Sequence, residues 1–291
     1  MLYGQNRLRL NRFLSVLIAL LLIGCQAYPM LPQEAPTNSA NNQALRLLGH
    51  IEGSALTVKV QGHYAYVGFS YEMAILDIAD PTMPRWVSGV AYPTNALWLN
   101  DHYAYLVGRA GFAVLDIADP TQPTIIASLP TQSTSLSVAA AGDHAYFVNV
   151  NGLHGINLVD PTELYEESLL ELPGGMGRIQ IQGNYAYITA SDGFHIVSLT
   201  QPETPVQVGF IPTTNAVDGL ALTARYAYLG VGQQLYTVDI TKPTRPATAA
   251  VVDVATTLLN LIVAETYLYA TGGYSGLRVF DISNPVNVRK I

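Results

Sequence analysis

Arg178 and Asp218 are the pair best suited to chemistry in a chain whose charged residues make up only 12%. A guanidinium and a carboxylate that meet in a fold can form a salt bridge, which is the structural interpretation. They can also bind an anion or a sugar together with Asn95 and Asn260, whose amides donate and accept hydrogen bonds. Both interpretations require a fold that brings distant parts of the chain to one place.

Other patterns that would carry catalysis are weak. Arg109, Arg178 and Arg278 suggest a sialidase-like carboxylate clamp, but the Ser-x-Asp-x-Gly-x-x-Trp box does not occur. The sequence contains no Gly-x-Ser-x-Gly nucleophile motif and no phosphate-binding glycine loop. Hydrolysis by paired carboxylates needs two acids at one site. The loops into the first strands contain only Asp218, and Glu52 lies just upstream of the first of these loops. We therefore expect no catalytic residues, and a hydrolase or lyase is the alternative.

Metal sites are also disfavoured. His154 and His195 occupy equivalent positions in adjacent repeats, where a metal or an acid–base pair is one interpretation. Neighbouring sheets pack about 10 Å apart, which makes shared ligation of one ion awkward. Pairs such as Asp77 and Asp80 could suggest calcium, but the dense set of oxygen ligands that calcium needs is missing. We expect no metal and no cofactor.

A repeat of about 41 residues organises the chain from residue 45 onward. Its first anchor is Tyr-Ala-Tyr or a close variant, and its second is an aspartate-rich segment that ends in proline, about eleven residues later. Aspartate before proline after a strand is turn chemistry, and we expect the tyrosines to be packing residues. The second tyrosine of the first anchor recurs at Tyr66, Tyr105, Tyr146, Tyr187, Tyr228 and Tyr269.

Each repeat reads as four short strands, because runs rich in β-branched and aromatic residues are bounded by Gly, Asn, Asp and Pro. Four-stranded units of this length, repeated six times, predict an all-β, six-bladed β-propeller over residues 45–291. The last repeat stops after three strands. Residues 45–52 (LRLLGHIE) would supply its fourth strand and close the ring, although 286–291 compete for the same edge.

The loops that lead into the first strands would gather at one end of the central axis. Asn95, Arg178, Asp218 and Asn260 fall in these loops, and Lys59, Trp98 and Gln180 lie two positions further along the same strands. We therefore expect these seven residues to line a ligand site at the axis. The aligned loop segments are 54–57, 93–96, 134–137, 175–178, 216–219 and 257–260.

The N-terminal residues predict export. Arg7, Arg9 and Arg12 precede an uncharged apolar run over 13–23, which is the layout of a signal peptide over 1–24. Leu22-Ile-Gly-Cys25 resembles the bacterial lipobox, which implies lipidation of Cys25. Residues 25–44 would then be a lipidated cysteine and a flexible tether. The lipid would anchor the protein to the cell envelope, at the outer membrane or the outer face of the cytoplasmic membrane.

The repeats are similar to the LVIVD-repeat family of bacterial and archaeal propellers. The closest segments are Gly276-Leu-Arg-Val-Phe-Asp-Ile-Ser-Asn-Pro285 and Ala113-Val-Leu-Asp-Ile-Ala-Asp-Pro120, whereas the third and fourth repeats depart from the pattern. The resemblance implies a propeller found on surfaces or secreted, and it implies no particular activity.

Charge and composition narrow the partners. The net charge is −7, and it would become −10 once the three arginines of the signal peptide are removed. An acidic body does not neutralise phosphates, so nucleic acid is excluded as a partner. We expect a monomeric, lipid-anchored, non-catalytic module that binds a protein or a glycan.

Overall fold

The structure is a computed structural model that describes residues 54–272 and 276–291. These ranges hold β-strands and no helix. The first three sheets consist of β1 (Ala55–Gln61), β2 (Tyr64–Phe69), β3 (Met73–Asp77) and β4 (Arg85–Val90); β5 (Ala96–Leu99), β6 (Tyr103–Gly108), β7 (Gly111–Asp116) and β8 (Thr124–Leu129); and β9 (Ser137–Ala141), β10 (His144–Asn149), β11 (Gly152–Asn157) and β12 (Tyr165–Glu171).

The second half of the chain repeats the arrangement. Its sheets consist of β13 (Met176–Gln182), β14 (Tyr185–Ala190), β15 (Gly193–Ser198) and β16 (Val206–Pro212); β17 (Val217–Leu222), β18 (Tyr226–Val231), β19 (Gln234–Asp239) and β20 (Ala247–Asp253); and β21 (Asn260–Ala264), β22 (Tyr267–Thr271), β23 (Leu277–Asp281) and β24 (Arg289–Lys290).

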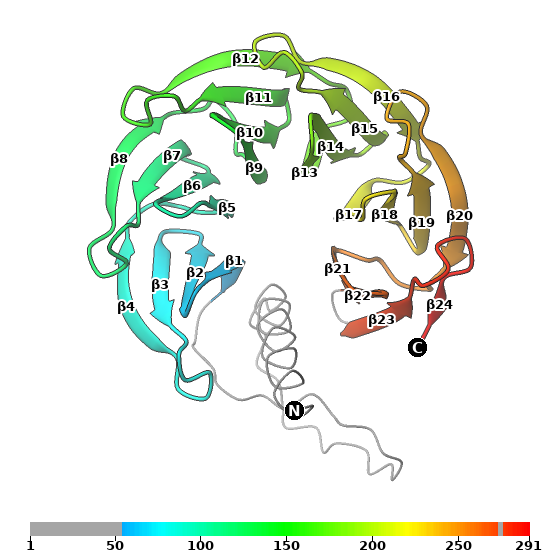
Figure 1. The fold of residues 1–291 in the computed structure, drawn as a ribbon, viewed down its shortest axis with the longest axis horizontal. Helices are drawn as coiled ribbons and strands as arrows, with labels where there is room; N and C mark the ends of the chain where they lie inside the picture. Colours follow the sequence, from blue (N-terminus) through cyan, green and yellow to red (C-terminus); the bar gives the residue numbers. More distant parts are fainter. Residues whose placement is uncertain (1–53, 273–275) are drawn as a thin grey trace, which may run out of the picture.

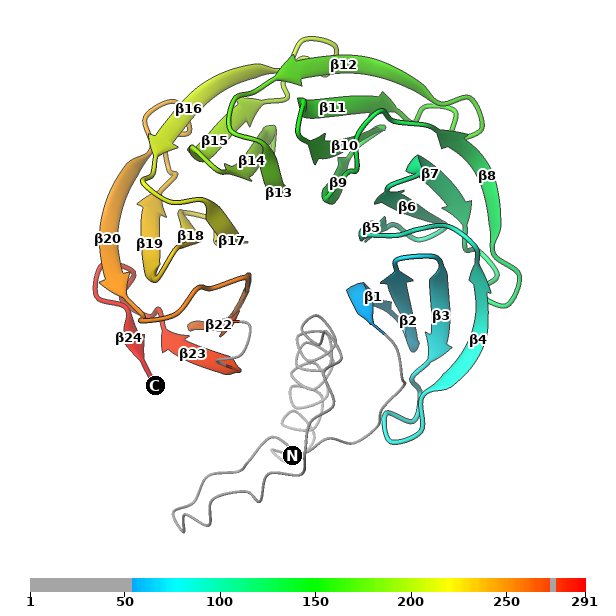
Figure 2. The same cartoon turned by 180° about the vertical axis from the view of Figure 1, so that it is seen from behind.

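The six sheets are arranged around one axis, each with its first strand innermost and its fourth strand at the rim (Figure 1). All pairings within a sheet are antiparallel, as between β6 and β7 and between β14 and β15. Figure 2 shows the same ring from behind. The predicted six-bladed propeller of four-stranded blades is thus confirmed, and we number the blades 1 to 6 in chain order.

The core consists of apolar layers between successive blades. One cluster lies at each junction from blades 1 and 2 to blades 5 and 6, and a sixth lies on the other face of blade 1. The third strands of blades 1 to 4 are almost wholly buried, because both faces of these sheets are covered. In blades 1 to 5, the second tyrosine of the anchor packs into one of these clusters, which confirms the predicted packing role. The residues are Tyr66, Tyr105, Tyr146, Tyr187 and Tyr228.

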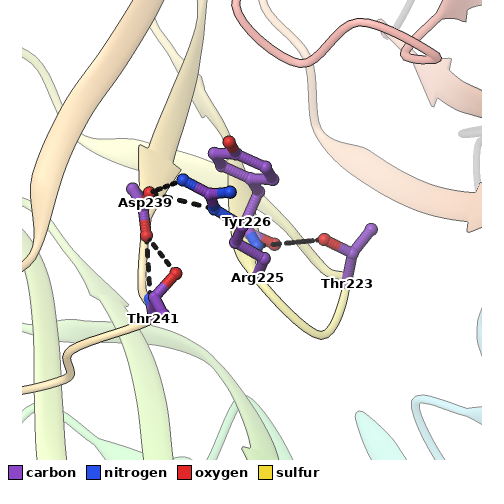
Figure 3. A network of polar contacts seen from close by, with 5 residues as sticks. All are labelled: Thr223, Arg225, Tyr226, Asp239 and Thr241. Carbon is purple, nitrogen blue, oxygen red and sulfur yellow. Dashed lines mark hydrogen bonds and ion pairs between the residues drawn. The ribbon is translucent and has the colours of Figure 1, made fainter.

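The aspartates of the second anchor close turns, as predicted. Asp80 Oδ1 accepts hydrogen bonds from Thr82 N at 2.9 Å and from the Thr82 hydroxyl at 2.6 Å. Asp239 does the same with Thr241 in blade 5, where it also pairs with Arg225 (Figure 3). Each carboxylate is therefore used locally to hold the chain as it turns between the third and fourth strands.

The outer strand of blade 6 comes from the C-terminus. β24 pairs antiparallel with β23 through Arg289 and Lys290, after a turn in which the Asn287 N–H donates to the carbonyl of Asn284 at 3.0 Å. The preference for residues 45–52 at this edge is therefore corrected, because the chain turns back after its Asn-Pro segment as in the other blades. Residues 45–52, the signal peptide, Cys25 and the tether lie outside the described residues.

Candidate functional site

The predicted site residues lie on or just before the innermost strands. Asn95 directly precedes β5, Arg178 lies within β13, Asp218 lies within β17, and Asn260 begins β21. The innermost strands of successive blades are neighbours around the axis (Figure 1). We call the end of the ring formed by the loops into these strands the axial loop face.

Arg178 reaches the neighbouring blade, but it does not form the expected salt bridge. Its Nε donates to the backbone carbonyl of Asp218 at 2.7 Å, and the described residues show no ion pair between the two side chains. Asp218 is the extra residue of a β-bulge between Val217 and Gly219. A bulge leaves its residue out of the regular ladder, which frees this carbonyl for the guanidinium.

Two glutamines on the same strand repeat this contact. Gln180 Nε2 donates to the carbonyl of Leu220 at 3.1 Å, and Gln182 Nε2 donates to that of Ala224 at 3.2 Å. An innermost strand pairs along one edge only, so its other edge needs acceptors and donors from elsewhere. Arg178 and Gln180, predicted as ligand residues, therefore join blade 4 to blade 5.

Asn95 behaves in the same way between blades 2 and 3. Its Nδ2 donates to the carbonyl of Ser135 at 3.1 Å. Sequence reasoning placed Asn95 correctly on the axial loop face, but could not show that the amide already has a partner in the fold.

Burial shifts the pKa values of Arg178 and Asp218 in opposite directions. Burial lowers the pKa of Arg178, while the negative charge of Asp218 opposes that shift. Burial likewise raises the pKa of the Asp218 carboxyl, and Arg178 acts in the opposite direction. Removal from water disfavours the charged form of both groups, and their mutual attraction offsets part of this.

Lys59 and Trp98 form a second contact, between blades 1 and 2. Lys59 Nζ lies 5.8 Å from the centroid of the Trp98 ring, within the range of a cation–π interaction. Desolvation by the surrounding blades lowers the pKa of Lys59. Asn260 pairs with Thr271 at the start of β21 and is half-buried. The contacts thus join the predicted residues in separate pairs, and a shared ligand remains a prediction.

His154 and His195 each have their own partners. The two nitrogens of His154 face Glu166 Oε1 at 3.2 Å and Asn149 Oδ1 at 3.0 Å. Those of His195 face Gln207 Oε1 at 3.2 Å and Asp192 Oδ1 at 3.0 Å. Within residues 54–272 and 276–291, no group of three or more His, Cys, Asp or Glu side chains is arranged to hold a metal.

The structure shows a polar network in blade 3 that is not predicted from the sequence. His144 Nε2 lies 2.6 Å from Glu167 Oε2, and Asn157 Nδ2 donates to Glu167 Oε1 at 3.0 Å. His144 stands where the other blades have the first tyrosine of the anchor, and it pairs with Asn157 across β10 and β11. Comparison of the repeats position by position would have found this change.

The LVIVD repeat pattern matches the chain in five segments, at residues 52–91, 93–131, 173–211, 216–254 and 259–289. These segments cover more than half of the sequence. The chain belongs to the LVIVD-repeat family. Within this LVIVD-repeat protein, blade 3 lies between the second and third matched segments, which agrees with its departures from the anchor residues.

Solved structures similar to this LVIVD-repeat protein are propellers of low sequence identity. Periplasmic gluconolactonase PpgL from Pseudomonas aeruginosa is 14% identical, with a TM-score of 0.69 over 79% of this chain and 81% of that one. The Swd1 β-propeller domain from Myceliophteria thermophila is 14% identical, with a TM-score of 0.65 over 81% and 85%. A functionally unknown protein from Desulfotomaculum acetoxidans is 13% identical, with a TM-score of 0.67 over 83% and 85%.

These likenesses establish the fold and carry no activity to this chain. No curated protein matches the sequence. None of the described residues forms a helix long and apolar enough to cross a membrane.

Proposed function

We propose that this LVIVD-repeat protein is a non-catalytic binding module, exported and anchored to the cell envelope through a lipid on Cys25. Its axial loop face would dock a protein or a glycan. The observation that carries the proposal is a set of exposed leucines at equivalent positions of this face. Leu56, Leu136 and Leu259 are 40%, 49% and 38% exposed.

The position of these leucines supports a docking role. In blades 1, 3 and 6, each leucine lies one residue before the point where the innermost strand begins its regular pairing with the second strand. Asn95 and Asp218 stand at the same position in blades 2 and 5. Exposed apolar surface rimmed by polar residues marks interaction sites, and the leucines favour a protein over a glycan.

Neighbouring loops extend the surface. Tyr71, in the loop between β2 and β3, is 72% exposed, and the Arg109 guanidinium lies 5.0 Å from the centroid of its ring. Arg109 belongs to the corresponding loop of blade 2. Tyrosine and arginine are enriched among the residues that contribute most to binding at protein interfaces.

Cross-linking in cells, followed by purification, tests the docking role. The triple variant Leu56→Ser, Leu136→Ser, Leu259→Ser should lose the cross-linked partner while keeping the unfolding midpoint. A matched control is Ile125→Ser, Val206→Ser, Val251→Ser, because these exposed residues lie on the outer strands β8, β16 and β20. Equal capture of the partner by both triple variants would contradict the proposal.

The anchor is tested separately. Cys25→Ala should abolish labelling with palmitate and release the protein from the membrane fraction. Cys25→Ser is a second variant with the same expected result. Membrane association that persists in both variants would show that Cys25 does not anchor the protein.

A hydrolase or lyase at the axis is the second candidate. It is favoured by the half-buried Asp218, whose pKa is raised by burial beside the Arg178 guanidinium, as suits a general acid. A lactone is the first compound to test, because one propeller of similar fold is a periplasmic gluconolactonase. Asp218→Asn should then abolish lactone hydrolysis, with Glu203→Gln as the control, because Glu203 is an exposed acid in the turn between β15 and β16. Unchanged hydrolysis in Asp218→Asn would eliminate this candidate.

A further inference from the structure

Three residues of blade 3 depart together from the pattern of the repeats. Where β10 has His144, the equivalent residue is tyrosine in the other five blades. Asn157 replaces the aspartate of blades 1, 2, 5 and 6. Glu167, which lies at the bulge between β11 and β12, replaces an aliphatic residue. The equivalent bulge residues of blades 1, 2, 4 and 5 are Val87, Ile126, Val208 and Ala249.

In blades 1 and 2, the residues equivalent to His144 and Glu167 pack in the apolar core. Tyr64 and Val87 pack against the same core cluster in blade 1, and Tyr103 and Ile126 do so in blade 2. In blade 3 the tyrosine and the aliphatic residue are both replaced by ionisable residues. A polar pair of this kind generally stabilises a fold no better than an apolar pair of similar size. Stability therefore gives no reason for the exchange.

The three changes converge on one carboxylate. Glu167 Oε2 lies 2.6 Å from His144 Nε2, while Glu167 Oε1 accepts from Asn157 Nδ2 at 3.0 Å and from the Tyr165 hydroxyl at 3.4 Å. Asn157 still caps its turn, because its Oδ1 accepts from Val159 N at 3.0 Å. An aspartate there would make the same cap but would repel Glu167. The asparagine thus keeps the turn and fixes the carboxylate.

The fixed carboxylate in turn orients the imidazole. The His144 and Glu167 side chains are 18% and 16% exposed, so the contact is largely shielded from water. With Nε2 directed at Glu167, Nδ1 is the ring nitrogen left for a ligand, as an acceptor in the neutral ring and as a donor in the imidazolium. None of the hydrogen bonds found in the described residues uses Nδ1 of His144.

A cavity adjoins this imidazole. It has a volume of about 310 Å³ and lies between blades 3 and 4, at the end of the ring opposite the axial loop face. His144 and Tyr146 line it from blade 3, and Leu199 and Pro202 line it from blade 4. Gly142 and Gly183 contribute the backbone of two tight turns, where an added Cβ would meet no atom within 4 Å.

The wall of the cavity offers neutral hydrogen-bonding groups. Burial, together with the charges of Glu167 and Glu203, raises the pKa of Tyr146 to about 12, so that its hydroxyl stays protonated. Those two carboxylates also disfavour an anionic ligand. Leu199 and Pro202 provide an apolar surface from blade 4, beside the polar residue Asn184. This combination of polar groups and apolar surface suits the two kinds of surface of a sugar ring.

We propose that the cavity between blades 3 and 4 is a binding site for a neutral, hydroxylated small ligand, of the class of sugars and polyols. His144 Nδ1 forms a hydrogen bond with a ligand hydroxyl, and Glu167 and Asn157 are positioning residues for His144. The site is independent of the axial loop face, from which it is separated by the length of the blades.

The test is a titration of the full-length protein with glucose, galactose, N-acetylglucosamine and glycerol. Binding is followed by calorimetry and by the ring-nitrogen chemical shifts of His144. At least one of the four compounds should bind and should shift the His144 signals. Failure of all four compounds to shift these signals would overturn the proposal.

The matched variant restores the ordinary repeat: His144→Tyr, Asn157→Asp, Glu167→Val. Because other blades fold with these residues, the variant should keep its unfolding midpoint and yet bind the sugar at least about tenfold more weakly. Glu167→Gln keeps the shape but weakens the bond to the imidazole, so it should bind with intermediate affinity. Unchanged affinity in the restored variant would show that the network only supports the blade.

The control for the other face is the leucine triple variant, Leu56→Ser, Leu136→Ser, Leu259→Ser. It should bind the sugar as the natural sequence does, while the restored blade 3 variant should still capture the cross-linked partner. The two proposals therefore fail or succeed separately.

Discussion

Blade 4 meets its two neighbours in different ways. Toward blade 5, three side chains of β13 donate to backbone carbonyls of the next innermost strand and its turn. Toward blade 3, the junction opens into a cavity of about 310 Å³ beside His144. Toward blade 3, the described residues show a single hydrogen bond between the innermost strands, in which Ile179 N donates to the Ser137 hydroxyl at 3.2 Å. The two junctions therefore differ in the number of these hydrogen bonds and in the cavity beside His144.

The apolar layers of the two junctions are nevertheless alike. Ile188 and Val148 belong to the layer between blades 3 and 4, and Leu229 and Phe194 belong to the layer between blades 4 and 5. An apolar layer is therefore the feature that both junctions of blade 4 share. The polar contacts beside it differ: three side chains of β13 bind carbonyls of blade 5, whereas the junction with blade 3 holds the cavity that we propose as a ligand site.

Removal of the apolar layers should have the largest effect. Ile188→Ala and Leu229→Ala should each lower the free energy of unfolding by about 2–5 kcal/mol, because both side chains are fully buried and leave a cavity. Urea unfolding measures both losses. A loss well below this range in only one variant would show that the two junctions do not share the same apolar support.

Removal of the blade 3 carboxylate should rank second. Glu167→Ala leaves His144 Nε2 and Asn157 Nδ2 without their acceptor, which should cost about 1–3 kcal/mol. The variant that restores the ordinary repeat should cost much less, since it removes donors and acceptor together. Urea unfolding of both variants tests the difference. Equal losses would mean that the network does not act as a unit.

The cross-links toward blade 5 should contribute less. Gln180→Ala should lower the free energy of unfolding by about 0.5–1.5 kcal/mol, the usual net value of one hydrogen bond. Gln182→Ala is the control, because its hydrogen bond to Ala224 is exposed and should count for less. A larger loss in Gln182→Ala would contradict the view that these bonds are strongest inside the ring.

The smallest effect should be the acid response of the turns. Hydrogen bonds from Thr241 and Arg225 lower the pKa of Asp239 to about 2 (Figure 3). A folded-state pKa below the unfolded value of about 3.9 gives stability that is present above that value and is lost as pH falls toward 2. Asp239→Asn should reduce this acid dependence, as judged from urea unfolding at several pH values. An unchanged acid dependence would show that Asp239 does not contribute to it.

Blade 4 offers the comparison within the same molecule. Ser198 occupies the place of Asp239, accepts a hydrogen bond from Thr200 N at 3.4 Å and carries no carboxylate, so Ser198→Ala should leave the acid dependence unchanged. This variant separates the loss of a turn cap from the loss of a titrating group.

Much of the fold could be predicted because each repeat has the same pattern of strand-forming residues and the same turn residues. Four short strands are predicted in each repeat, and each of the six blades has four. The site was harder. Arg178 and Asp218 were correctly paired in space, but the bulge at Asp218 exchanged a carboxylate contact for a carbonyl contact. Such a bulge depends on strand register, which cannot be predicted from any single residue.

The sequence by itself determined the number of blades, their four strands and the turns, because these depend on periodic patterns and on local hydrogen bonds such as that of Asp80 with Thr82. Only the tertiary structure decided which polar residues have partners. Gln180 reaches a carbonyl forty residues away, and Glu167 meets His144 across three strands. These contacts depend on how blades stack and how strands bulge, so they are set by packing between distant segments rather than by any local pattern.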